Sequence, residues 1–215
     1  MKLKYGTWNV SKLHREQVGV LTAAGISPLS AAVLVSRGFD TPEKAKAFLS
    51  SGHGELLDPM GLPDMPQAAQ RVQTALDAHE KIAVFGDYDV DGITSTCLLT
   101  DFFTRRGGLV TWYIPARLEE GYGLSATAIR GLHALGVTLI ITVDCGITAV
   151  EEARLCHELG IDLVITDHHE CKQELPQAVA VVDPHRKDST YPFPHLAGVG
   201  VAFKLAAAVS GDQDR

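Results

Sequence analysis

Short apolar runs alternate with amphipathic segments along the second part of the chain. The run from Ile82 to Phe85, for example, lies between two segments with apolar residues at helical spacing. Strands that alternate with helices predict a parallel sheet with helices on both faces. We expect strands at 82–85, 109–114, 138–143, 162–166 and 178–182, and helices at 68–79, 94–105, 125–135 and 148–159. The predicted fold class is therefore α/β.

The first part of the chain has a different pattern. Residues 1–65 carry helical patterns without strong strand signals, and Thr41 followed by Pro42 is typical of a helix start. A glycine- and proline-rich run at 51–66 indicates a long loop. We therefore expect a helical lead-in and linker over residues 1–65, followed by the α/β domain over residues 66–215.

Composition narrows the class of protein. The chain has 215 residues, 46% of them hydrophobic, and a net charge of -7, which argues against a strongly basic surface for nucleic acid. Bound divalent cations would cancel part of that charge, so a phosphate-bearing substrate stays compatible. The four cysteines form no C-x-x-C pair, and no signal peptide or membrane span is recognisable. We expect a cytoplasmic protein that does not contact a membrane.

Three aspartates follow the first predicted strand. Asp87, Asp89 and Asp91 alternate in the motif F-G-D-Y-D-V-D-G. In an extended chain, alternate side chains project to the same side, so these carboxylates are expected to converge where ligands of α/β sheets bind. They would repel one another unless a hard cation such as Mg²⁺ or Mn²⁺ neutralised them. Gly92 then lets the chain turn, and Thr94 or Ser95 is expected to open the next helix. The alternative is that this motif is only an acidic surface turn.

Two further predicted strands end in similar chemistry. Asp144 ends the run L-I-I-T-V-D, and Asp167, His168 and His169 end the run D-L-V-I-T-D-H-H. Each group alone is compatible with a turn or a surface position. In a parallel sheet, however, these strand ends lie along one edge. Together with the first cluster they supply oxygen and imidazole ligands suited to a pair of Mn²⁺ or Mg²⁺ ions.

Two glycine-containing segments are candidates for substrate binding. In R-L-E-E-G-Y-G-L-S, Gly123 and Ser125 precede a predicted helix whose N-terminal N–H groups favour anions, and Arg117 could add a charged contact. The alternative is an ordinary loop with a serine cap. Gly198 and Gly200 enter an apolar helix, where they permit either close backbone approach to the site or tight helix packing.

The motifs in this order and spacing resemble those of the DHH phosphoesterases: F-G-D-Y-D-V-D-G, T-V-D-C-G-I, T-D-H-H and H-L-A-G-V-G-V-A-F-K-L. The R-L-E-E-G-Y-G-L-S segment narrows the resemblance to RecJ-type exonucleases. The resemblance implies an enzyme of recombination and repair that hydrolyses single-stranded DNA from the 5′ end to nucleoside 5′-monophosphates. We expect the protein to be a monomer. A helicase or a single-strand-binding protein is an expected partner.

The resemblance also implies roles for the acidic and histidine residues. Asp89, Asp91 and His168 are expected to be metal ligands, with Asp87 close by, and Asp144 is expected to bridge two ions.

Further roles follow for the residues that would contact the substrate. His169 is expected to contact the substrate phosphate, and Asp167 to orient its neighbours. Water activated by the two ions would attack the phosphorus. Tyr122 or Tyr88 could stack on bases, and this stacking would help to select single strands.

The sequence departs from the RecJ pattern beyond the G-V-G-V-A-F segment. A further aspartate ligand, a second phosphoesterase domain and an OB-fold are expected there and are not found within 215 residues. This suggests a fragment, a truncated form or a degenerate form with weak activity of its own. The alternatives are another DHH activity, on oligoribonucleotides or cyclic dinucleotides, or a non-catalytic DNA-binding scaffold. Pyrophosphate is disfavoured because Phe85 stands where a histidine would be expected.

Overall fold

The computed structural model describes residues 12, 14–50, 56–116, 121 and 123–211. The chain divides into two compact units, Met1–Leu56 and Leu57–Arg215. In the first unit, the described residues form helices α1 (Arg15–Ala23), α2 (Pro28–Ser36) and α3 (Pro42–Leu49). Thr41 caps α3 by accepting a hydrogen bond from the Lys44 N–H group, so the predicted helix start is confirmed.

The second unit is built on a five-stranded parallel sheet with the strand order β2-β1-β3-β4-β5. The predicted α/β class is confirmed. The strands are β1 (Lys81–Phe85), β2 (Leu109–Tyr113), β3 (Leu139–Val143), β4 (Asp162–Thr166) and β5 (Ala180–Val182). The helices are α4 (Met65–Asp77), α5 (Val90–Arg105), α6 (Ala126–Ala134), α7 (Val150–Glu158) and α8 (Gly198–Ser210), with a 3₁₀ turn at Pro59–Gly61.

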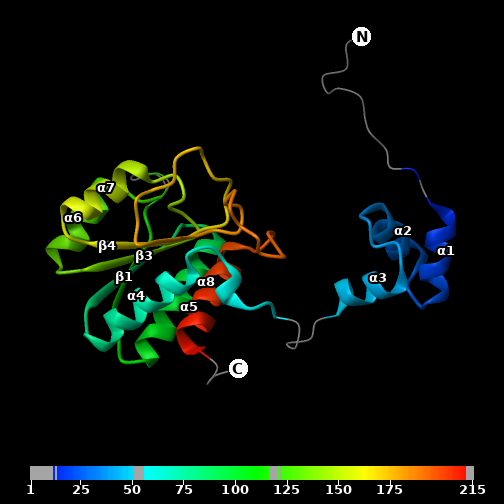
Figure 1. Ribbon diagram of the computed structural model, residues 1–215, viewed down its shortest axis with the longest axis horizontal. Coiled ribbons are helices and arrows are strands. Elements are labelled where there is room, and N and C mark those ends of the chain that lie inside the picture. The colour runs from blue at the N-terminus through cyan, green and yellow to red at the C-terminus, as the bar shows by residue number, and fades with distance from the viewer. Residues whose placement is uncertain (1–11, 13, 51–55, 117–120, 122, 212–215) are drawn as a thin grey trace, which may run out of the picture. The chain divides into compact units, whose positions relative to one another are not determined.

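Helices cover both faces of this sheet. Figure 1 shows α4, α5 and α8 on one side and α6 and α7 on the other. Alternate side chains of β1 divide between the two layers: Ile82 and Val84 belong to the core under α4, α5 and α8, and Ala83 and Phe85 to the core under α6 and α7. Burial on both faces explains the uninterrupted apolar runs of the central strands.

The α/β unit begins before the expected boundary at residue 65. Leu62 is buried in its core, and the carbonyl oxygen of Leu57 accepts hydrogen bonds from the Tyr191 hydroxyl and the Lys204 ammonium group. Glycine and proline mark this segment as irregular backbone, but they do not show against which surface it packs. None of the described helices is long and apolar enough to cross a membrane.

A candidate metal centre at the carboxyl edge of the sheet

The strand register places four aspartates in one row across the sheet. Phe85, Thr142, Ile165 and Val181 are register partners on β1, β3, β4 and β5. The residue two positions after each partner is an aspartate, namely Asp87, Asp144, Asp167 and Asp183. All four side chains are at most 4% exposed. The carboxyl edge of the sheet is therefore a line of buried acids, each at the same step beyond its strand.

The turn from β1 into α5 differs from the expectation. The helix begins at Val90, because Asp89 caps it: one carboxylate oxygen accepts hydrogen bonds from the N–H groups of Asp91 (2.8 Å) and Gly92 (3.0 Å). Thr94 and Ser95 lie within the helix and donate to backbone carbonyls one turn earlier. Their predicted role as helix starts is wrong, since an aspartate caps a helix as well as Ser or Thr does.

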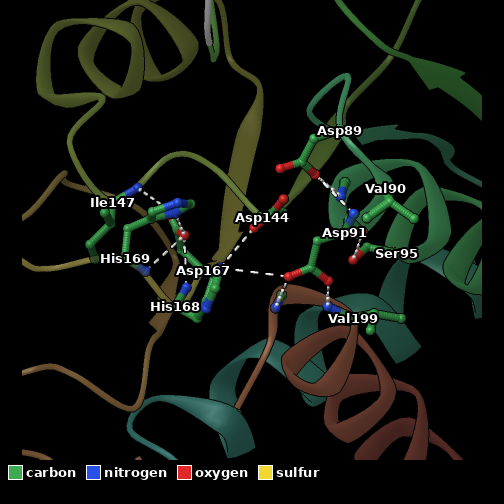
Figure 2. Close-up of polar contacts among 12 residues, drawn as sticks. Asp89, Val90, Asp91, Ser95, Asp144, Ile147, Asp167, His168, His169 and Val199 are labelled. Carbon is green, nitrogen blue, oxygen red and sulfur yellow. Dashed lines mark hydrogen bonds and ion pairs between the residues drawn. The ribbon is translucent and has the colours of Figure 1, made fainter. Parts of the chain in front are cut away.

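Asp91 binds the N-terminus of α8, whereas an extended chain would direct its side chain to the same side as Asp87 and Asp89. It lies in the first turn of α5, and its two carboxylate oxygens accept hydrogen bonds from the N–H groups of Gly198 and Val199, both at 2.7 Å. Asp91 therefore satisfies the N-terminus of α8, where a negative charge is favourable. One of its oxygens also lies 3.7 Å from Nε2 of His168. Figure 2 marks this contact with a dashed line.

Asp144 is the centre of the cluster. It is 2% exposed, has a left-handed backbone conformation (φ 59°), and its Oδ1 lies 3.0 Å from Nε2 of His168. Donor atoms of Asp87, Asp89 and Asp144 lie within 4.8 Å of one another, and so do those of Asp144, His168 and His169. Among the described residues, Asp144 is thus shared by two groups that could each hold a metal ion.

The electrostatics of the cluster fit a bound cation. Burial, together with the nearby charges of Asp91 and Asp89, raises the pKa of Asp144 to about 7. The hydrogen bonds from the backbone N–H groups of Gly92 and Asp91 lower the pKa of Asp89, so this carboxyl group favours the ionised form. Divalent cations would neutralise the charges of the cluster, and carboxylate and imidazole donors are ligands that Mn²⁺ accepts.

Asp167 joins two loops at the back of the cluster. Its Oδ2 accepts a hydrogen bond from the N–H group of Ile147 (2.9 Å), and its Oδ1 lies 2.7 Å from both the N–H nitrogen of His168 and Nδ1 of His169. These bonds hold the backbone of His168 and the ring of His169 in position. The hydrogen bond to Asp167 also raises the pKa of His169 to about 9.

Comparisons with known proteins show which family the chain is similar to. The model of the DHH family, N-terminal domain, matches residues 81–215. The chain belongs to the DHH family. It is 46% identical over 206 residues to the single-stranded-DNA-specific exonuclease RecJ of Bacillus subtilis (strain 168), covering 95% of this chain and 26% of that relative. The predicted resemblance to RecJ-type exonucleases is confirmed.

Solved structures of related proteins contain metal ions. The chain superposes on RecJ from Thermus thermophilus in complex with Mn²⁺ with a TM-score of 0.69 and 30% identity, covering 93% of this chain and 28% of that one. The complex of RecJ from the same organism with Mg²⁺ gives 0.56 and 26%, covering 93% and 24%. The chain thus spans about a quarter of the length of these relatives.

The predicted substrate-binding residues do not all lie at the acidic cluster. Gly198 contacts the cluster directly, since its N–H group binds Asp91. Ser125 caps α6 by accepting a hydrogen bond from the Ala128 N–H group. Gly123 adopts a positive φ of 81° in the same loop. Arg117 and Tyr122 lie outside the described residues.

Asp183 is the member of the acidic row that no sequence motif singled out. It ends β5, is completely buried, and burial raises its pKa to about 7. The signal is present in the sequence, because V-V-D follows the same pattern of an apolar strand and a terminal aspartate as T-V-D and I-T-D.

We expect the stability of the metal-free DHH domain to fall as the pH rises from about 5 to 9. The folded-state pKa values of Asp144 and Asp183 are raised from 3.8 to about 7, and that of His169 from 6.5 to about 9. Each group therefore binds its proton more tightly in the folded chain, and this stabilisation is lost as the pH rises through the folded-state value.

Melting temperatures in the presence of a chelator would measure this trend. The Asp183→Asn variant should have a flatter profile below pH 7, because it removes one of the two raised carboxyl groups. A wild-type profile without slope between about pH 5 and 9 would contradict the assignment of these shifts to the folded state.

Proposed function

We propose that this chain forms the metal-binding domain of a 5′-to-3′ exonuclease that hydrolyses single-stranded DNA to nucleoside 5′-monophosphates. The observation that carries the proposal is the position of Asp144, which is shared by two groups of metal donors. The similarity to RecJ, which covers 95% of this chain, supports the choice of substrate.

The donor groups support a site for two ions, Mn²⁺ or Mg²⁺. In this proposal Asp87, Asp89 and Asp144 hold one ion, and Asp144 and His168 hold the other. Asp91, whose carboxylate lies 3.7 Å from Nε2 of His168 and also caps α8, would be a further ligand for the second ion. Bound ions of this kind lower the pKa of a water molecule and stabilise charge on a transferring phosphoryl group.

The protein's own groups would position the substrate. His169 is held by Asp167 through Nδ1, and in this proposal its ring contacts a phosphate oxygen of the substrate. Because the pKa of His169 is raised to about 9, its ring is cationic at neutral pH and suited to an anion. Asp167 fixes the ring through this bond and fixes the loop through the N–H group of Ile147.

The wider setting follows from the similarity to RecJ and is part of the proposal. We place the protein in recombination and repair, in the cytoplasm and as a monomer, with a helicase or a single-strand-binding protein as its partner. Size-exclusion chromatography with light scattering tests the monomer, since a stable dimer would have twice the chain mass of 23.1 kDa.

Calorimetric titration with Mn²⁺ tests the metal centre. We expect two ions to bind to the wild-type chain and one to bind to Asp87→Ala or His168→Ala, because each substitution removes a ligand from only one donor group. Equal binding by all three proteins would refute the proposed ligands.

Nucleotide release tests the reaction. With Mn²⁺, 5′-labelled single-stranded DNA should yield labelled mononucleotides, and a duplex of the same sequence should yield fewer. Hydrolysis of short oligoribonucleotides or a cyclic dinucleotide in preference to DNA would favour the alternative DHH activity. Metal binding and DNA binding without hydrolysis would favour the scaffold.

A further inference from the structure

The turn that follows β5 is held in place from both sides. Asp183 accepts the N–H group of His185 on its carboxylate at 2.7 Å, and Pro184 between them fixes the backbone. On the other side, the guanidinium of Arg186 donates to the carbonyl oxygen of Val181 and forms ion pairs with Asp64 and Asp188. The turn therefore presents the His185 ring in a fixed direction.

The His185 ring contacts the backbone of His168, a residue of the proposed metal site. Nδ1 of His185 lies 2.6 Å from the carbonyl oxygen of His168. A carbonyl oxygen only accepts hydrogen bonds, so Nδ1 carries the proton and donates it. The side chain of His168, in turn, faces Asp144 at 3.0 Å. His185 thus contacts the residue that supplies an imidazole to the cluster, from an adjacent strand end.

The surroundings of His185 argue against a role as a basic surface patch. The sequence H-R-K suggests a short cationic segment, but the side chain of Arg186 is only 10% exposed and forms ion pairs with Asp64 and Asp188. The His185 side chain is itself 25% exposed. Its Nδ1 is occupied inside the protein, so the ring is built into the fold.

We infer that His185 is a positioning residue, which fixes the backbone of His168 and thereby the direction of the His168 ring toward Asp144. The inference rests on the proposed metal site. Residues that orient metal ligands by hydrogen bonds typically change metal affinity by about ten- to a hundredfold when they are removed. Asp183 contributes to this positioning, because it accepts the hydrogen bond that holds the turn with His185 in place.

Three substitutions of His185 test whether its hydrogen bond to the His168 carbonyl oxygen, and not the packing of its ring, affects metal binding. Asparagine places an N–H donor where Nδ1 stands, glutamine places its donor one bond further out, and alanine has no donor. We expect Mn²⁺ affinity, measured by calorimetry, to fall by about tenfold or more in His185→Ala and His185→Gln and to remain within about threefold of wild type in His185→Asn. His157→Ala, an exposed histidine on α7, is the matched control and should bind as wild type does.

Nuclear magnetic resonance tests the same bond without metal. The His185 ring should be the Nδ1–H tautomer, and the backbone amide nitrogen of His169, which follows the accepting carbonyl, should shift in the alanine and glutamine variants but not in the asparagine variant. An Nε2–H tautomer, or an asparagine variant no better than glutamine, would overturn the inference. If the wild-type chain binds no Mn²⁺ while the tautomer and shifts agree, the metal proposal fails and the positioning of His168 stands.

Discussion

Replacing Asp144 with asparagine is expected to remove high-affinity binding of both Mn²⁺ ions. Asp144 belongs to both donor groups, so no other single substitution among the described residues removes a carboxylate from each of them. We expect at least about a hundredfold loss of affinity in calorimetric titrations, at the upper end of what loss of a single group near a metal costs. Asp101→Asn, which changes an exposed carboxylate further along α5, is the control and should bind as wild type does.

The same substitution should stabilise the chain when no metal is present. Burial and the charges of Asp91 and Asp89 disfavour the ionised Asp144, which raises its pKa to about 7. An amide carries no charge, and asparagine tolerates the positive φ at this position. The melting temperature in chelator at about pH 8 should therefore rise, by about 2–4 °C for each kcal/mol of relieved repulsion. A variant that lost both metal binding and stability would show instead that Asp144 is needed for folding.

Gly198→Ala is expected to damage the metal site, and Gly200→Ala is expected to leave it intact. A methyl group on Gly198 would lie 2.6 Å from Oδ1 and 2.8 Å from Cβ of Asp144, closer than real contacts allow. Neither side can move easily, because Asp144 is buried and the Gly198 N–H group is bound to Asp91. We expect a loss of about 1–3 kcal/mol in the free energy of unfolding, together with weaker Mn²⁺ binding.

The Gly200 variant is a matched control on the same turn of α8. Its methyl group would meet Leu196 no closer than 3.4 Å, which is ordinary contact. Because alanine favours a helix more than glycine does, this variant should gain about 0.5–1 kcal/mol of stability and keep the affinity for Mn²⁺. Denaturant unfolding and calorimetry on the two variants measure both effects. Equal behaviour of the pair would contradict the close approach of α8 to Asp144.

These two glycines also show what a motif leaves open. The sequence allows close approach to the site or tight helix packing for both. The structure assigns the approach to Gly198, which lies against Asp144, and the packing to Gly200, which lies against Leu196. Local sequence cannot separate them, because the neighbour that decides the role of Gly198 is Asp144, which lies far away in the chain.

The α/β class, and the edge of the sheet where the site lies, follow from local sequence. Apolar runs that are buried on both faces need helices on both sides, and a run that ends in an aspartate marks the carboxyl end of its strand. This pattern is sufficient to place Asp87, Asp144 and Asp167 at one edge, and the strand register agrees with that placement.

The use of each carboxylate depends instead on packing between distant segments. Asp89 and Thr94 are both good helix caps locally, and in the structure Asp89 caps α5. Asp91 turns to the amides of α8, 107 residues later in the chain, and His185 reaches the carbonyl group of His168 from the next strand. Such partners are set by strand register and helix docking. These arise from burial summed over the whole core, so no short segment of sequence contains them.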